Sequence, residues 1–187
     1  TTTTTSGSTT TTSLGGPHVV IWAVGAGFSG SAGNEFVIIY NNSGSSQNLS
    51  NWLIKSASAS PVGGEPTCTA NSTTRYTFSS VTLANGKYFL IGSQNYVPSS
   101  YVGNTTADFT HTAGWSVSDT GPHFLLCNIG TLVDKVGWGT ASYAEGGNPA
   151  PANHVIYRSN ETVDTDNNGN DFVAGITNSI SLRNSSN

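Results

Sequence analysis

A segment near the C-terminus, residues 164–172 with the sequence DTDNNGNDF, carries the side chains best suited to hold a cation. Its candidate ligands stand at alternate positions: Asp164, Asp166, Asn168 and Asn170. With Gly169 at the sixth position, this is the first half of a calcium-loop pattern, which supplies the oxygen ligands that Ca²⁺ prefers. The twelfth position is Gly175 where that pattern has Glu, although Asp171 could substitute. The segment is therefore a candidate calcium site, and no cofactor is required.

The same segment has a purely structural interpretation. Asp and Asn side chains accept hydrogen bonds from nearby backbone N–H groups and so form Asx-turns without any metal. The sequence leaves both interpretations open, and a calcium ion is not required for either the fold or a reaction.

Other residue patterns give no support for an enzyme. The four histidines lack the HExxH spacing of a metalloprotease, and no Gly-x-Ser-x-Gly elbow is present. Nothing places Glu35 and Asp108 together as paired carboxylates, and we interpret Glu35 as structural. The GxGxxG pattern at residues 25–30 is followed by a second strand-like segment, residues 33–41, instead of the helix that a dinucleotide site needs.

Charge is scarce along the whole chain. Only 9% of residues are charged, the net charge is −4, and the six Lys and Arg are scattered. A nucleic-acid partner is not expected, because phosphate binding needs a basic surface. No apolar run approaches the ~18 residues of a membrane span. The lack of Met indicates a chain whose start was removed by processing.

Two cysteines, Cys68 and Cys127, offer too few ligands for a zinc site. In an oxidising compartment they would pair and close a loop of about 60 residues, which stabilises a fold by roughly 2–4 kcal/mol. The alternative is two buried free thiols.

Glycosylation is the other modification that the sequence allows. Six Asn-x-Ser/Thr sequons occur, which become meaningful only for an extracellular chain. Their acceptors are Asn41, Asn48, Asn71, Asn104, Asn160 and Asn184.

The elements that must position these residues are strands. Short apolar and β-branched runs recur between Gly, Pro and Asn turn signals, without sustained helical periodicity. The expected strands cover residues 18–25, 33–41, 49–54, 76–78, 81–92, 123–139 (a hairpin) and 154–159. Long polar loops are expected at residues 56–74 and 93–122, and residues 175–187 are expected to trail off. This pattern predicts an all-β sandwich or barrel.

A low-complexity start precedes these strands. Residues 1–13 contain two Thr runs around Ser-Gly-Ser. Such a stretch is either a flexible linker or, because Thr favours extended backbone, an added β-strand. We divide the chain into an arm, residues 1–16, and a domain, residues 17–187.

Seven segments in order resemble the secreted prokaryotic type of lamin tail domain, whose members carry VVISEV-, EFIELYN-, LSGW-, VDxVGxG- and DTDNN-like pieces. The counterparts are residues 18–25, 35–41, 49–52, 86–91, 133–139, 145–152 and 164–172. The resemblance implies an immunoglobulin-like β-sandwich without catalytic activity. It also implies an extracellular accessory or surface module, of the kind found beside secreted nucleases or in large surface proteins.

Departures from that family pattern fall on one strand face. Trp22-Ala23 stands where the family has Ser-Glu, and Ile38 replaces a Glu. Because side chains alternate along a strand, Phe36, Ile38 and Tyr40 share a face, with Trp22 expected nearby. This apolar face is either an interaction surface or is covered by a long loop, 56–74 or 93–122.

Two functions follow as hypotheses. The first is a non-catalytic extracellular structural protein, a filament or layer subunit whose arm adds as a β-strand to a neighbouring copy. Its predicted interface comprises Thr1, Thr2, Thr3, Thr4, Thr5, Thr9, Thr10, Thr11, Thr12, Trp22, Phe36, Ile38 and Tyr40. The alternative is an accessory glycan- or DNA-binding module of a larger secreted protein, with Trp115, Trp138 and Tyr143 as stacking platforms for sugars.

Overall fold

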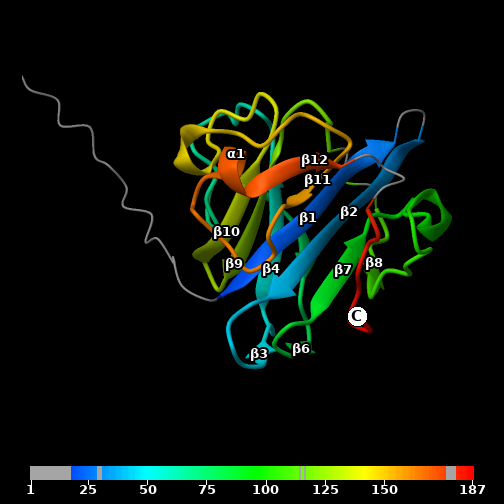
Figure 1. Ribbon diagram of the computed structural model, residues 1–187. Coiled ribbons are helices and arrows are strands. Elements are labelled where there is room, and N and C mark those ends of the chain that lie inside the picture. Colours follow the sequence, from blue (N-terminus) through cyan, green and yellow to red (C-terminus); the bar gives the residue numbers. More distant parts are fainter. Residues whose placement is uncertain (1–17, 29–30, 114, 116, 176–179) are drawn as a thin grey trace, which may run out of the picture.

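The computed structural model describes residues 18–28, 31–113, 115, 117–175 and 180–187. Figure 1 shows that the regular secondary structure in this part of the chain consists mainly of strands, joined by long loops. The predicted boundary between an arm and a domain at residue 16 falls outside the described residues and stays a prediction.

One layer is a six-stranded sheet in the order β12-β11-β1-β2-β7-β8. Neighbouring strands are antiparallel except β7 and β8, which are parallel. The strands are β1 (Val19–Phe28), β2 (Ser31–Asn41), β7 (Tyr88–Gly92), β8 (Phe109–Thr110), β11 (Val155–Arg158) and β12 (Phe172–Gly175).

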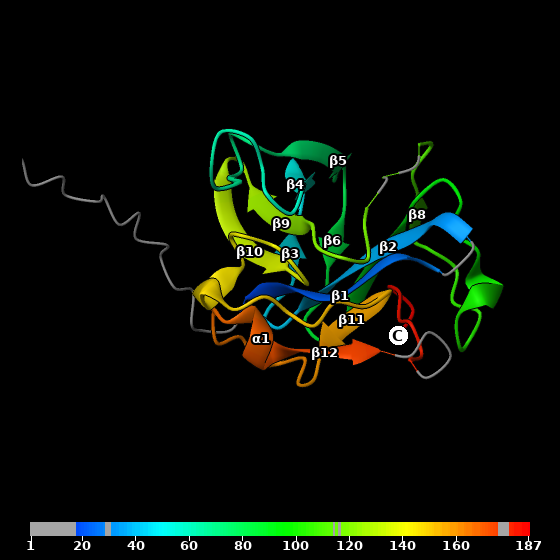
Figure 2. The same ribbon diagram turned by 90° about the horizontal axis from the view of Figure 1, so that it is seen from above.

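The second layer is a four-stranded sheet in the order β10-β9-β4-β5, which faces the first sheet in Figure 2. Its strands are β4 (Trp52–Ala57), β5 (Thr73–Thr77), β9 (His123–Asn128) and β10 (Thr131–Gly137). The remaining elements are the small β3–β6 pair and three single turns of helix. They are β3 (Gln47–Asn48), β6 (Thr82–Leu83), η1 (Pro98–Ser100), η2 (Glu145–Gly147) and α1 (Asn168–Asp171).

The main core fills the space between the two sheets. Val37 and Ile39 of β2 pack there with Phe124 and Leu126 of β9, and all four are fully buried. Alternating strand residues thus supply one inward face per sheet, as the sequence pattern indicates. The predicted all-β sandwich is confirmed.

The glycine-rich pattern at residues 25–30 lies in the β1–β2 hairpin. Its first residues continue β1, and the next described residue, Ser31, begins β2. No helix follows, in agreement with the rejection of a dinucleotide site. The β9–β10 hairpin also forms where it was predicted, with left-handed backbone at Ile129 (φ 43°) and Gly130 (φ 87°).

The C-terminal region differs from the expectation that it trails off. Strand β12 completes the edge of the six-stranded sheet, and Ile180 and Leu182 are buried against its outer face. The helical turn α1 was also not predicted from the sequence. It forms because the Asn167 side chain caps it by accepting a hydrogen bond from the N–H of Asn170.

Candidate functional site

Arg158, the last residue of β11, is the centre around which the acidic segment folds. Its side chain is fully buried, and its guanidinium donates two hydrogen bonds of 3.0 Å to the two carboxylate oxygens of Asp134. It donates another of 2.9 Å to Asp171 and one of 3.3 Å to Asp164. Two of the three carboxylates around this arginine therefore come from residues 164–172.

The same network also supplies hydrogen-bond partners to the backbone where the pairing of β1 is irregular. A bulge at Trp22 shifts the pairing of β1 with β2 between Ile21 and Ala23. The Ile21 N–H donates to the carboxylate of Asp134 at 2.5 Å, and its carbonyl accepts from Nε of Arg158 at 3.0 Å. Ile21 lies beyond the end of β11 and has no partner in that strand. The side chains of Asp134 and Arg158 make its backbone hydrogen bonds instead.

Charge compensation in this network is reflected in the pKa values. Burial alone would lower the pKa of Arg158, but Asp134, Asp164 and Asp171 together raise it above its usual value. Burial disfavours ionisation of Asp164, yet His18 at 3.0 Å and the charge of Arg158 hold its pKa below the usual range. The ion pair between Asp164 and the buried Arg158 therefore helps to anchor the segment.

Asn168 ties the same segment to β10. It is fully buried, and its side-chain oxygen accepts hydrogen bonds from the N–H groups of Gly137 (2.8 Å) and Glu145 (3.1 Å). Its amide donates to the carbonyl of Lys135 at 2.9 Å and to the Glu145 carboxylate at 3.1 Å. All four hydrogen-bonding positions of this amide are used by the protein itself.

These contacts bear on the four predicted calcium ligands. Asp164 faces Arg158 and His18, Asn168 turns into the protein, and Asn170 is exposed. Asp164 also accepts from the N–H of Asp166, an Asx-turn. The arrangement favours the structural interpretation, and the calcium loop stays a prediction.

Asp164 does belong to an acidic cluster that the sequence did not indicate. Carboxylate oxygens of Asp134, Glu145 and Asp164 lie within 4.8 Å of one another. Arg158 lies among them, and Glu145 accepts from the Lys135 N–H and the Asn168 amide. Burial, followed by the charges of Asp134 and Asp164, raises the pKa of Glu145 well above its usual value.

Of the two alternatives for the apolar face, the structure shows coverage by the chain itself, so its residues are not exposed as the predicted interface requires. Trp22, Phe36, Ile38 and Tyr40 form a second core on the outer side of the six-stranded sheet, and none is more than 8% exposed. Side chains that cover it include Tyr96, Tyr101, Ile180 and Leu182. Phe36, for example, meets Tyr101 edge-on at 5.1 Å between ring centroids. The covering loop belongs to residues 93–122, one of the two loops considered, and the C-terminal residues add to it.

Glu35 is structural, as predicted. It is buried within β2, opposite Ala26 of β1, and its carboxylate accepts from the backbone N–H groups of Trp115 (2.8 Å) and Val117. Asp108 instead accepts from the N–H groups of Leu90 (2.8 Å) and Ser185 (3.0 Å). The two carboxylates therefore hold different segments of the chain.

The tryptophans proposed as sugar platforms are core residues. Trp115 is 1% exposed and Trp138 is not exposed at all. Both pack on Phe124, with ring centroids 5.7 Å and 6.0 Å away. Only Tyr143 of the three is partly exposed, so this stacking surface was predicted wrongly.

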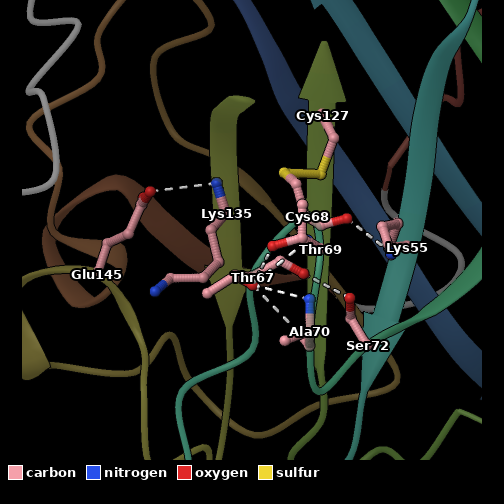
Figure 3. The surroundings of a disulfide bond; sticks show 9 residues. All are labelled: Lys55, Thr67, Cys68, Thr69, Ala70, Ser72, Cys127, Lys135 and Glu145. Atoms are coloured by element: carbon pink, nitrogen blue, oxygen red, sulfur yellow. Dashed lines mark hydrogen bonds between the residues drawn. A yellow bond between two sulfur atoms is a disulfide. The ribbon is translucent and has the colours of Figure 1, made fainter. Parts of the chain in front are cut away.

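Cys68 and Cys127 form the predicted disulfide, shown in Figure 3. It attaches the loop after β4 to the outer face of β9, between Leu53, Leu125 and Leu132. Lys55 reinforces the attachment by donating from Nζ to the Cys68 carbonyl at 2.8 Å.

A groove lies where the two sheets reach their edges on one side of the sandwich. It has a volume of about 380 Å³ and is lined by β5 and by residues of and after β8. Its lining residues are Thr74, Arg75, Tyr76, Thr77, Ser79, Phe109 and His111. Tyr76 and Phe109 meet at its base, with ring centroids 4.5 Å apart, which joins the two sheet edges.

The groove was not predicted, because it depends on bringing together strands more than thirty residues apart. The only local signal was Tyr76, a buried aromatic residue among exposed Thr residues of Thr73–Thr77. Regular alternation is absent there, because the pairing of β5 with β4 shifts register between Thr74 and Tyr76.

Comparison with known protein families agrees with this geometry. The family model described as Lamin Tail Domain matches residues 13–140, more than half of the chain. The chain belongs to the lamin tail domain family. The resemblance read from the sequence is thereby confirmed, and the sandwich is of the immunoglobulin-like type.

This lamin tail domain also resembles a solved structure. A DUF4876 family protein from Bacteroides thetaiotaomicron superimposes with a TM-score of 0.56 at 12% identity, over 86% of this chain and 72% of that one. At this identity the likeness concerns the fold alone. No curated protein matches the chain.

The matched residues end before Arg158 and the acidic segment, yet both are part of the same folded unit. Asp134 lies inside the matched region, and it binds Arg158 of β11 beyond that region. The C-terminal residues of this lamin tail domain therefore complete its six-stranded sheet. Among the described residues, no helix is long and apolar enough to cross a bilayer.

The six sequons of the lamin tail domain differ in accessibility. Asn41 is fully buried, and its amide donates to the carbonyls of Ser45 (2.8 Å) and Leu83 (2.7 Å). Asn71 and Asn184 are half-buried. The exposed acceptors are Asn48, Asn104 and Asn160. The Thr residues of the predicted interface, Thr1 to Thr12, lie outside the described residues.

Proposed function

We propose that this protein is a non-catalytic extracellular structural protein. Copies of it assemble into a filament or layer when the Thr-rich arm of one adds as a β-strand to a sheet edge of the next. The observation that carries the proposal is the open side of the sandwich, where both sheets end at β5 and β8 and leave a groove between them. Unpaired sheet edges are the usual acceptors for an extended segment.

Several features support a structural and not a catalytic role. The buried carboxylates bind a buried arginine or backbone N–H groups, which is the arrangement of residues that hold segments in place. His123, the buried histidine, has Nδ1 2.8 Å from the Ser58 carbonyl and accepts at Nε2 from the Tyr143 N–H. A side chain with both ring nitrogens bound in this way serves the fold.

The extracellular assignment rests on the disulfide and the surface composition. A disulfide between Cys68 and Cys127 persists in oxidising compartments. The surface relies on Thr, Ser and Asn instead of charge, with 9% charged residues in the chain. Copies with a net charge of only −4 repel one another weakly, which favours association.

The arm is tested by deleting residues 1–13 and examining purified protein by negative-stain microscopy and sedimentation velocity. The full chain should form polymers, and the deletion variant should remain monomeric. A second variant that replaces residues 1–13 by a Gly/Ser sequence of equal length keeps the reach but lowers the β-propensity, and it should also remain monomeric. Polymers from the deletion variant would rule out the arm as the assembling element.

The alternative, an accessory binding module of a larger secreted protein, draws support from the same groove. Its aromatic base of Tyr76 and Phe109 beside Arg75 and His111 is suited to a glycan. This alternative requires a monomeric full chain that binds a glycan or DNA. Large polymers without measurable ligand affinity would count against it.

A further inference from the structure

We infer that the free edge of β5, with the adjoining groove, is the acceptor for the arm of a neighbouring copy. This inference rests on the proposed function and adds the place and the register of strand addition. In its sheet, β5 pairs with β4 alone among the strands of the described part.

The opposite edge of the same sheet is already occupied. Along β10, the N–H of Lys135 donates to Glu145, and its carbonyl accepts from the Asn168 amide. The N–H of Gly137 donates to Asn168, and its carbonyl accepts from the N–H of Ala150 at 2.9 Å. These contacts leave little backbone on β10 for an added strand.

The edges of the six-stranded sheet are shorter. Strand β8 has two residues and β12 has four, whereas β5 has five and its pairing with the β4 side extends to Phe78. A longer edge offers more backbone hydrogen bonds to an incoming strand, so β5 is the best acceptor that the structure provides.

The register of the open edge follows from the pairing of Phe78. Its N–H donates to the carbonyl of Trp52 at 3.0 Å, and its carbonyl accepts from the N–H of Asn51 at 2.8 Å. Because the N–H and C=O groups of successive strand residues point to opposite sides, those of Thr77, the last residue of β5, point away from β4. Thr77 lines the groove, and its backbone would hydrogen-bond an added strand.

Side-chain chemistry identifies the occupant as the arm. The exposed positions of β5 are Thr73, Thr74 and Thr77, and the arm is itself Thr- and Ser-rich and uncharged. Cross-strand Thr–Thr and Thr–Ser pairs stabilise neighbouring strands. Arg75, the one charged residue of β5, is turned aside and donates from Nε to the Ser56 hydroxyl at 2.7 Å.

The arm is also long enough to reach another molecule. Residues 1–17 precede the first described residue, His18. Seventeen extended residues span about 55 Å, whereas pairing with a five-residue strand needs only about 17 Å. The remainder can bridge from one sandwich to the edge of the next.

The decisive variant is Thr77→Pro in the full chain. Proline removes the outward N–H, and an edge strand tolerates it where that N–H does not serve the sheet. Thr77→Pro should abolish polymers, whereas the matched Thr77→Ala variant keeps the N–H and should polymerise. Near-ultraviolet circular dichroism checks that both variants keep the packed sandwich.

Mixing the two defective proteins provides a result that misfolding cannot imitate. Thr77→Pro retains a donor arm, and the variant lacking residues 1–13 retains an intact β5 edge. Each alone should be monomeric, and an equimolar mixture should form a 1:1 heterodimer in sedimentation velocity. A monomeric mixture, or polymers of Thr77→Pro alone, would overturn the β5 assignment.

The outcomes separate this inference from the function on which it rests. If removing the arm abolishes polymers but Thr77→Pro does not, the arm acts elsewhere and only the β5 assignment fails. If the full chain never polymerises, the proposed function fails first. A full-length monomer that is destabilised by removing the arm would indicate that the arm binds its own sandwich, which also overturns the inference.

Discussion

Arg158 and Asp134 form a two-point hydrogen-bonded ion pair between the two sheets of the sandwich. Arg158 ends β11 of the six-stranded sheet, Asp134 lies in β10 of the four-stranded sheet, and both bonds measure 3.0 Å. Both side chains are fully buried. A buried pair of this kind adds little net stability compared with apolar packing, but it is costly to break because one charge remains unpaired.

Replacing Arg158 by Lys should therefore destabilise the protein strongly. Lysine keeps the charge but cannot donate hydrogen bonds to Asp134, Asp171 and the Ile21 carbonyl at once. In the native protein these bonds come from the three nitrogens of the planar guanidinium group. We expect a loss of about 3–5 kcal/mol in the free energy of unfolding, measured by denaturant titration.

Arg183→Lys is the matched control. Arg183 is 43% exposed, contacts Glu161 at 3.2 Å and lies over the rings of Trp22 and Tyr88. Because lysine can keep both the exposed ion pair and a cation over these rings, the same substitution should cost only about 1 kcal/mol. Equal effects of the two substitutions would show that the buried fork has no special importance.

His123 should make stability depend on pH near neutrality. Burial lowers its pKa, and the Ser58 carbonyl only partly opposes this. A neutral ring with the proton on Nδ1 donates to Ser58 and accepts from Tyr143, so the folded protein resists protonation. The unfolded chain gains a proton near its ordinary pKa of about 6.5, and stability is consequently lost as pH falls below that value.

The contribution of His123 to this slope is at most about 1.4 kcal/mol per pH unit, and the slope should decrease by that contribution in His123→Gln. The comparison uses the slope of unfolding free energy between pH 5 and 7, so a general loss of stability in the variant does not interfere. His154→Gln, at a side chain 34% exposed, controls for the loss of an imidazole. An unchanged slope in His123→Gln would disprove the assignment.

The fold could be predicted from the sequence because its determinants are local. Alternation along β2 places Val37 and Ile39 in the inter-sheet core and Phe36 and Ile38 on the other face, as expected. What covers that second face could not be predicted, because the Tyr96 and Tyr101 loop and the C-terminal residues reach it from distant positions. An apolar outer face was thus a sign of a second core.

The candidate sites were harder to predict for the same reason. The acidic segment was recognised from the sequence, but the positive charge that it binds in the structure is the Arg158 side chain, which the spacing does not indicate. Nothing in the local sequence indicates that Asp134, from the other sheet, also binds Arg158. The β5 edge is likewise defined by the absence of a further strand in the described part of its sheet. Spacing along one segment reveals neither relationship.

Glycan occupancy should follow accessibility. If the protein is secreted by a glycosylating cell, mass spectrometry of native material should find glycans at Asn48, Asn104 or Asn160 and none at Asn41. The Asn41 amide is buried and donates two backbone-directed hydrogen bonds. Asn41→Gln should lower stability without changing the glycan mass. A glycan on Asn41 would contradict the fold around the start of the β2–β3 turn.

Calcium removal tests the two interpretations of the acidic segment. Because Asp164 and Asn168 already bind protein donors, we expect EDTA to leave the melting temperature unchanged. Magnesium-loaded EDTA controls for ionic effects of the chelator. A lower melting temperature that is restored by Ca²⁺ and not by Mg²⁺ would instead establish the calcium loop predicted from the sequence. Asp166→Asn and Asn170→Ala should then reduce the calcium response, because they remove a carboxylate charge and an amide oxygen from the candidate ligands.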